Sequence, residues 1–123
     1  MDEVTALFNK AKNKLKNSKV LYEHGGYGDS VTLSYYAMFL SAKTLLIKRK
    51  CKFGKTHQNL IKEFSRVYVH EDTFDYNIYK YLASTQYLRE EVDYNPIDRI
   101  DERIAKQKIN QAEKFIKESE KFI

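Results

Sequence analysis

The chain of 123 residues contains a single cysteine, Cys51, and a single proline, Pro96. One cysteine cannot form an internal disulfide, so a reducing intracellular setting is the natural expectation. The chain has no long uncharged apolar run. Its first residues also lack the basic segment followed by an apolar stretch that marks a secretion signal. We therefore expect a cytoplasmic protein with no membrane span.

The usual signs of a metal or cofactor site are also absent. The three histidines, His24, His57 and His70, fall at no metal-ligand spacing, and one cysteine does not make a zinc site. No Gly-x-Ser-x-Gly elbow and no acidic cluster like those of di-iron bundles is present. Three of the four glycines lie within residues 25–28, but no Gly-Lys-Ser/Thr follows them. They predict a tight turn between helices rather than a phosphate cradle. The sequence predicts no metal and no cofactor.

Acidic residues are missing from one long stretch. None lies between Asp29 and Glu63, although seven lysines and arginines do. The net charge of +5 therefore divides unevenly, with 12 basic and 4 acidic residues in 1–62 and 10 basic and 13 acidic residues in 63–123. Such a block could attract phosphates by electrostatics alone, or it could be the solvated end of a helix with its loop.

The composition, 42% hydrophobic and 32% charged, is that of one globular domain, residues 1–123. The most apolar stretch is Asp29–Lys52, whose apolar residues recur at steps of three and four and predict a helix of about six turns. Asp29 or Ser30 could cap its start. The other amphipathic segments need this helix as a partner for their own apolar faces.

Four further segments show helical periodicity. The first covers Glu3 to about Glu23, and another begins at an N-cap on Thr56 and continues to about Val69. The next starts at residues 71–73 and ends before Pro96, and the last begins near Asp98 or Asp101. No segment alternates as a strand does. The predicted fold is an all-α, antiparallel up-and-down four-helix bundle with an additional fifth helix.

Arg89 is the most informative single residue. It follows Leu82 by seven residues and Thr85 by four, so it shares the inner face of its helix. A cation on that face needs a partner or a cleft, because burying it unpaired is unfavourable. Asp93 and Tyr94 follow at the end of the helix. They indicate either an ion pair that closes the helix or an anion site, since guanidinium forks suit phosphate oxygens.

Three short motifs occur in order: Ser34-Tyr35-Tyr36-Ala37-Met38-Phe39, Lys55-Thr56-His57 and Arg89-Glu90-Glu91-Val92-Asp93-Tyr94. In this order and spacing they resemble the HEPN family (higher eukaryotes and prokaryotes nucleotide-binding domain), in particular its small single-domain prokaryotic branch. The resemblance covers nearly the whole chain. It implies a helical bundle that often forms homodimers and is frequently encoded beside a minimal nucleotidyltransferase as a toxin–antitoxin pair.

The resemblance also implies a chemistry. Active HEPN toxins are metal-independent ribonucleases with an Arg-x4–6-His motif, and Arg89 matches its arginine. Position 94, where the shortest form of the motif has its histidine, holds tyrosine, a poor base near pH 7. The branch commonly has an Arg before Tyr-Tyr and a His after Met-Phe, and in this chain those positions hold Leu33 and Leu40. The expected protein is thus a HEPN module that binds nucleotide or RNA phosphates and a nucleotidyltransferase. The alternatives are a ribonuclease using Arg89, Asp93 and Tyr94, and a structural dimerising bundle.

The remaining candidates each have two interpretations. Tyr35 and Tyr36 are either core aromatics or part of the nucleotide site, with hydroxyls that need partners such as Arg89. Residues Lys55, Thr56 and His57 form either a capped helix start or a phosphate site at a helix N-terminus. A second Arg and His, Arg66 and His70, have only three intervening residues, and we expect them to form a surface i,i+4 pair. Tyr76, Tyr79 and Tyr87 suggest a dimer or partner contact.

Overall fold

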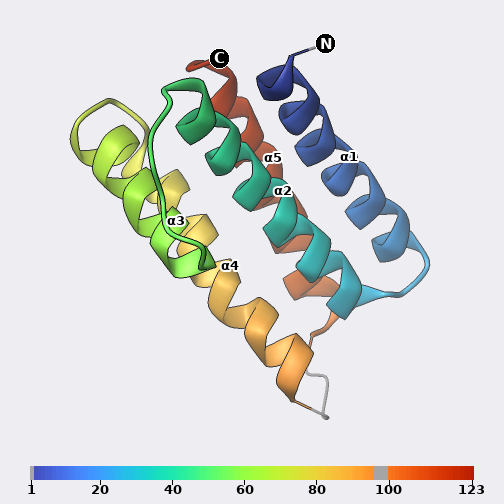
Figure 1. Ribbon diagram of the computed structural model, residues 1–123. Coiled ribbons are helices and arrows are strands. Elements are labelled where there is room, and N and C mark those ends of the chain that lie inside the picture. The colour runs from blue at the N-terminus through green and yellow to red at the C-terminus, as the bar shows by residue number, and fades with distance from the viewer. Residues whose placement is uncertain (1, 96–99) are drawn as a thin grey trace.

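The computed structural model describes residues 2–95 and 100–123, and within these ranges the chain forms helices and no strand. In order they are α1 (Glu3–Glu23), α2 (Tyr27–Lys48), α3 (His57–Phe64), the π-helical segment η1 (Ser65–His70), α4 (Tyr76–Tyr94) and α5 (Glu102–Glu120). Helices α1, α2, α4 and α5 run alternately in opposite directions, and α3 packs beside α2 and α4 (Figure 1). The expected bundle of four antiparallel helices with a fifth is confirmed.

Two helices start at the capping side chains that the sequence predicted. The Thr56 hydroxyl accepts a hydrogen bond from the Asn59 backbone N–H at 3.0 Å, and the Asp101 carboxylate accepts one from Ile104 N–H at 2.9 Å. Each cap pairs an N–H group of the first turn that has no partner within the helix. Of the two starts expected for the last helix, Asp101 is confirmed and Asp98 lies outside the described residues.

Two expected boundaries are wrong. Helix α2 begins at Tyr27 behind Gly26, so Asp29 lies inside its first turn instead of capping it, and the helix ends at Lys48 rather than Lys52. Helix α4 begins at Tyr76, after residues 71–73, because Asp75 makes the cap to Ile78 N–H at 3.1 Å. The start of α2 has no capping side chain because Gly26 occupies its N-cap, and Lys50, with φ of 57°, leaves helical geometry just beyond the C-cap Arg49.

The direction of α3 positions the site. After α2 the chain returns along the bundle, so α3 runs parallel to α2 and antiparallel to α4 (Figure 1). The His57 ring stacks on Phe39 in the middle of α2, with ring centroids 4.2 Å apart. Further along, the Tyr68 hydroxyl donates to the Leu45 carbonyl near the end of α2. The first turn of α3 therefore lies against the centre of α2.

Helix α2 is the centre of the core. Fourteen of its 22 residues are buried, between α1 on one side and α4 and α5 on the other. Among the described residues it is the one helix long and apolar enough to cross a membrane. However, 67% of its most apolar window is buried inside the bundle, as expected for the central helix of a helical core.

Small polar side chains let α1 approach α2 closely. The buried Ser18 hydroxyl lies 2.6 Å from the Ser30 carbonyl oxygen and 2.7 Å from the Ser34 hydroxyl. The Ser30 hydroxyl in turn donates to the Ser18 carbonyl at 2.9 Å. This reciprocal bonding satisfies groups that would be unfavourable to bury unpaired. Phe8 and Ala11 pack α1 into the core near its start, and Ser18 continues the contact between α1 and α2 towards the end of α1.

Candidate functional site

Arg89 lies over two tyrosine rings of α2. Its guanidinium carbon is 5.2 Å from the Tyr35 ring centroid and 5.7 Å from that of Tyr36. The Arg89 side chain is only 16% exposed, and its Nη1 donates to Asp93 Oδ2 at 2.8 Å. A cation over an aromatic face is stabilised by the ring quadrupole, more strongly where water is excluded. This arrangement holds the guanidinium at the edge of the core, next to solvent.

His57 joins the same group of residues from α3. Tyr35 OH lies 2.8 Å from His57 Nδ1. The imidazole also meets the Tyr36 ring edge-on, with centroids 5.9 Å apart. We call Arg89, Tyr35, Tyr36, His57 and Asp93 the Arg89 cluster. Three helices, α2, α3 and α4, build it.

The Tyr35 hydroxyl decides which His57 nitrogen carries the proton. Burial raises the pKa of Tyr35 far above its ordinary value, so the phenol keeps its proton. Its 2.8 Å contact with Nδ1 is the one hydrogen bond found for that hydroxyl among the described residues. If the phenol accepted this bond, its own buried O–H would have no described partner, so the phenol donates to Nδ1. The neutral imidazole then carries its proton on Nε2. His57 is thereby set as a hydrogen-bond donor.

His57 is held in its neutral form. Burial lowers the pKa of the His57 imidazole below 6.5, and the nearby positive charges of Arg89 and Lys43 lower it further. Glu90 opposes this shift with its negative charge. A ligand with negative charge beside the imidazole would act as Glu90 does, and it would raise that pKa.

The inner face of α4 carries unmatched polar groups beside the cluster. Arg89 Nε and Thr85 Oγ1 are buried and have no hydrogen-bond partner among the described residues. Of the guanidinium donors, Nη1 is the one with a described protein partner, Asp93. Buried groups without partners lower stability, so they call for an explanation outside packing. Arg89 thus makes the ion pair with Asp93 that the sequence allowed, and this pair leaves two buried polar groups of α4 unsatisfied.

The other predicted site residues make no described hydrogen bond, ion pair or ring contact with the cluster. Tyr94 is 82% exposed and lies with Tyr87, Glu90 and Glu91 around a shallow hollow at the end of α4. Lys55 and Thr56 are exposed, and the Thr56 hydroxyl is occupied as the cap of α3. The structure therefore brings together Tyr35, Tyr36, His57, Arg89 and Asp93 but not Lys55, Thr56 and Tyr94.

Sequence reasoning did not single out Phe39, whose ring supports His57 at 4.2 Å. Its position four residues after Tyr35, on the same helix face, was the available signal. The expected Arg66–His70 pair is wrong. Arg66 instead binds Glu63, and its Nη1 donates to Glu71 at 2.9 Å. The π-helical segment η1 brings residues five apart onto one face, which pairs Arg66 with Glu71.

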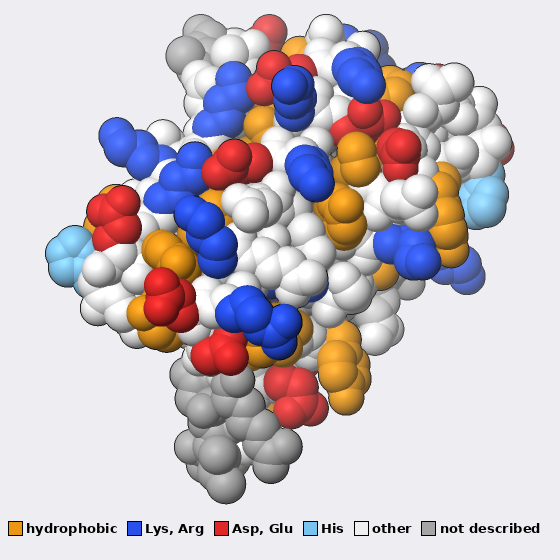
Figure 2. Space-filling view, turned by 180° about the vertical axis from the view of Figure 1, so that it is seen from behind, with side chains coloured by type: hydrophobic (Ala, Val, Ile, Leu, Met, Phe, Trp, Pro, Cys, Tyr) orange, Lys and Arg blue, Asp and Glu red, His pale blue; other side chains and the backbone are white. Residues whose placement is uncertain are grey.

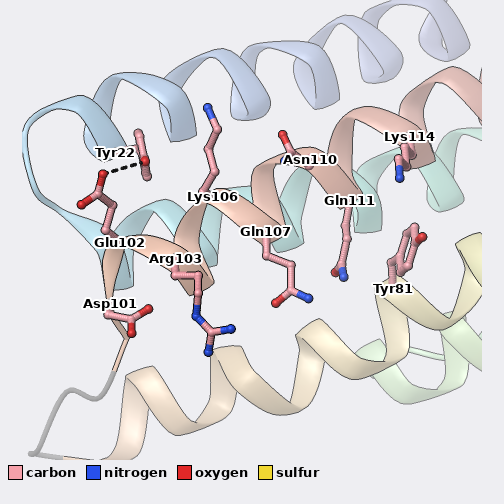
Figure 3. A pocket seen from close by; sticks show the side chains of 10 residues that line it. All are labelled: Tyr22, Tyr81, Asp101, Glu102, Arg103, Lys106, Gln107, Asn110, Gln111 and Lys114. Carbon is pink, nitrogen blue, oxygen red and sulfur yellow. Dashed lines mark hydrogen bonds between the residues drawn. The ribbon is translucent and has the colours of Figure 1, made fainter.

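A second hollow, of about 870 Å³, lies on the outer face of α5 between α1 and α4 (Figure 3). Its charges alternate, with Asp101 and Glu102 beside Arg103 and Lys106, and Tyr22 OH donates to Glu102 at 3.2 Å. On the face seen from behind, basic and acidic side chains are likewise interspersed (Figure 2). None of the predicted site residues lines this hollow, and its mixed charge does not favour an anion.

Comparisons with known proteins place the chain in context. The model of the HEPN domain matches residues 4–122. A Methanocaldococcus jannaschii protein named "Putative toxin MJ0605" is 35% identical over 116 residues, which cover 94% of this chain and 84% of that protein. Another, "Putative toxin MJ0142", is 25% identical over 121 residues, covering 98% and 82%. A Thermotoga maritima protein named "UPF0332 protein" is 26% identical over 114 residues, covering 93% and 86%.

Proposed function

The chain belongs to the HEPN family, and on that premise we propose that it is a toxin-type HEPN protein that binds RNA or nucleotide phosphates through the Arg89 cluster. The observation that carries the proposal is a guanidinium held over Tyr35 and Tyr36 with a neutral imidazole beside it. Arginine N–H groups and the His57 Nε2–H are donors for phosphate oxygens, and the guanidinium fork matches the geometry of phosphate as it does that of carboxylate. Two relatives named as toxins support the toxin type.

Binding is better supported than cleavage. Cleaving RNA without a metal needs a base to take the proton of the ribose 2′-hydroxyl. In the cluster the Asp93 carboxylate is engaged by Arg89, and His57 Nδ1 already accepts from Tyr35. Tyr94 points into solvent at the end of α4. Asp93 Oδ2 and His57 Nδ1 are thus already hydrogen-bonded in this arrangement, whereas Arg89 and the neutral imidazole each carry further N–H donors.

We propose further that the protein acts in the cytoplasm as a homodimer paired with a minimal nucleotidyltransferase. The outer side of α4 offers a surface for such a contact, because Tyr76 is 56% exposed and Tyr87 69%. Exposed aromatic residues are enriched at protein interfaces. Co-purification of a minimal nucleotidyltransferase with the protein from its native cells, and sedimentation of the purified protein, would test these assemblies directly.

Replacing Arg89 with methionine tests the binding proposal. Methionine fills the apolar space over the tyrosines, so the bundle should remain folded while RNA binding weakens about 10- to 100-fold, the effect of one or two lost charge-assisted hydrogen bonds. Fluorescence anisotropy with a labelled single-stranded RNA in EDTA measures this. The matched control is Arg103→Met, an exposed arginine on α5 that removes the same charge.

The same samples separate the alternatives. Equal affinities for Arg89→Met and Arg103→Met would refute the Arg89 cluster as the phosphate site. Cleavage of the RNA by wild type, lost in Arg89→Met, would replace the binding proposal with a metal-independent ribonuclease. A protein that neither binds nor cleaves RNA or nucleotide, yet forms a dimer, would be a structural bundle.

RNA affinity should also depend on pH through His57. A bound phosphodiester favours the charged imidazole and raises its pKa, so binding takes up a proton and affinity should increase as pH falls from 7 to 5. The phosphodiester itself does not titrate in this range. The His57→Gln variant, which keeps a donor but cannot titrate, should show a flatter pH dependence in the same anisotropy assay. A wild type as flat as the variant would contradict the predicted role of His57.

A further inference from the structure

A separate groove of about 870 Å³ lies between α3–η1 and α4, outside the Arg89 cluster. One wall comes from the loop before α3 and from α3–η1, and the other from Tyr79 and Gln86 of α4. Its volume is in the range of sites that bind small ligands. We call it the α3 groove and define it by Lys52, Phe53, Lys62, Arg66, Tyr79 and Gln86.

The α3 groove and the Arg89 cluster draw neighbouring residues from α3 and α4. Gln58, on its wall, follows His57 directly in the chain. Gln86, on the opposite wall, precedes Arg89 by three residues and so occupies the neighbouring turn of α4 on the same side. Groove and cluster residues therefore lie within one turn of each other on both α3 and α4.

The charge of the groove suits a polyanion. Lys52, Lys62 and Arg66 line it together with one carboxylate, Glu63; because Arg66 binds both Glu63 and Glu71, the unpaired positive charge comes from the two lysines. No ion pair among the described residues includes Lys52 or Lys62. These two lysines belong to the stretch between Asp29 and Glu63 that contains no acid. Their ammonium groups are available to neutralise phosphates.

The groove also contains two aromatic rings, those of Phe53 and Tyr79. Phe53 and Tyr79 are half-buried in it, and the Tyr79 ring is braced by stacking near Phe64, with centroids 6.4 Å apart. Gly54 lets the loop lie on α3, because a side chain there would place its Cβ 2.4 Å from Asn59 Nδ2. Because the loop lies this close to α3, the neighbouring residues Lys52 and Phe53 line the groove. Rings beside unpaired cations are the combination that binds single-stranded nucleic acid.

We propose that the α3 groove binds the part of a single-stranded RNA next to the phosphate held by the Arg89 cluster. Lys52 and Lys62 contact backbone phosphates, and a base stacks against Phe53 or Tyr79. An unpaired strand fits this arrangement because its bases are free to stack on side chains, whereas those of a duplex are not. The inference rests on the proposed function and adds to it a second surface, the α3 groove, that contacts the same single strand.

The test compares two double variants of equal charge. Lys52→Gln/Lys62→Gln removes the groove cations, and Lys10→Gln/Lys16→Gln removes two exposed lysines of α1, on the other side of α2 (Figure 1). We expect the groove variant to bind an eight-nucleotide single-stranded RNA about tenfold more weakly than the α1 variant. The slope of log affinity against log salt should fall by about 1.4, the value for two single-strand phosphate contacts. AMP affinity should be equal in both.

A ring variant gives an independent readout. Phe53→Leu keeps an apolar side chain but removes the stacking surface, so it should weaken binding of the RNA about five- to 100-fold while leaving AMP affinity unchanged. Equal RNA affinity for the groove and α1 double variants, with Phe53→Leu like wild type, would overturn the inference. If Arg89→Met still weakens binding in that case, the proposed function stands alone. If Arg89→Met has no effect but the groove variants do, the groove binds RNA and the proposed function fails.

Discussion

Replacing Phe64 with alanine is expected to lower the free energy of unfolding by about 3–5 kcal/mol, the usual effect of deleting a buried aromatic ring. The Phe64 side chain is fully buried where α3, α4 and α5 meet. Its ring centroid lies 4.9 Å from that of Phe74 and 5.9 Å from that of Phe115. Four aromatic rings surround it, those of Tyr68, Phe74, Tyr79 and Phe115. Because such rigid rings do not easily move into the vacated space, the cavity should remain.

Urea unfolding followed by circular dichroism measures this loss. The control is Tyr94→Ala at the end of α4, which removes a ring that is 82% exposed and should change stability by less than about 0.5 kcal/mol. A loss below about 1.5 kcal/mol in Phe64→Ala would show that the aromatic contacts between α3 and the bundle are weak. Because Phe64 anchors the helix that begins with His57, the variant should also bind RNA less well.

Replacing Lys108 with methionine is expected to act in the opposite direction, raising the free energy of unfolding at pH 7 by about 1–3 kcal/mol. Lys108 is only 8% exposed, and its Nζ contacts Gln111 Oε1 at 3.0 Å and Ser84 Oγ at 3.5 Å. None of the ion pairs among the described residues includes it. A buried ammonium without a carboxylate is unfavourable, and methionine fills a similar volume without charge.

The stabilisation should depend on pH. Burial lowers the pKa of the Lys108 ammonium below 10.5. Between the folded-state pKa and 10.5 the unfolded chain binds more protons than the folded chain, so the wild type gains stability as pH rises through this window. The advantage of Lys108→Met is therefore largest at neutral pH and should shrink towards pH 10.

Unfolding curves at pH 7 and pH 9.5 for wild type, Lys108→Met and the exposed control Lys114→Met provide the comparison. The control should match wild type at both pH values. A Lys108→Met protein less stable than wild type at pH 7 would mean that the contacts with Gln111 and Ser84 outweigh the burial of the charge.

The sequence by itself determined the helices and much of the inner face of each. Hydrophobic periodicity predicted the helical segments, and the caps at Thr56 and Asp101 lie where local chemistry placed them. It also placed Arg89 on the inner side of α4 beside Leu82 and Thr85. These features depend on residues a few positions apart, whose relative geometry the helix itself fixes.

Only the tertiary structure decided which of the candidate residues meet. His57 comes 22 residues after Tyr35, and contact between them depends on α3 running parallel to α2. The motif predicted a role for Tyr94, which is exposed at the end of α4, whereas the histidine that lies near Arg89 is His57 of α3. The choice of helix directions is made by packing over the whole core, through contacts between residues far apart in the chain. No local pattern carries that information, and so the Arg89 cluster is a property of the fold.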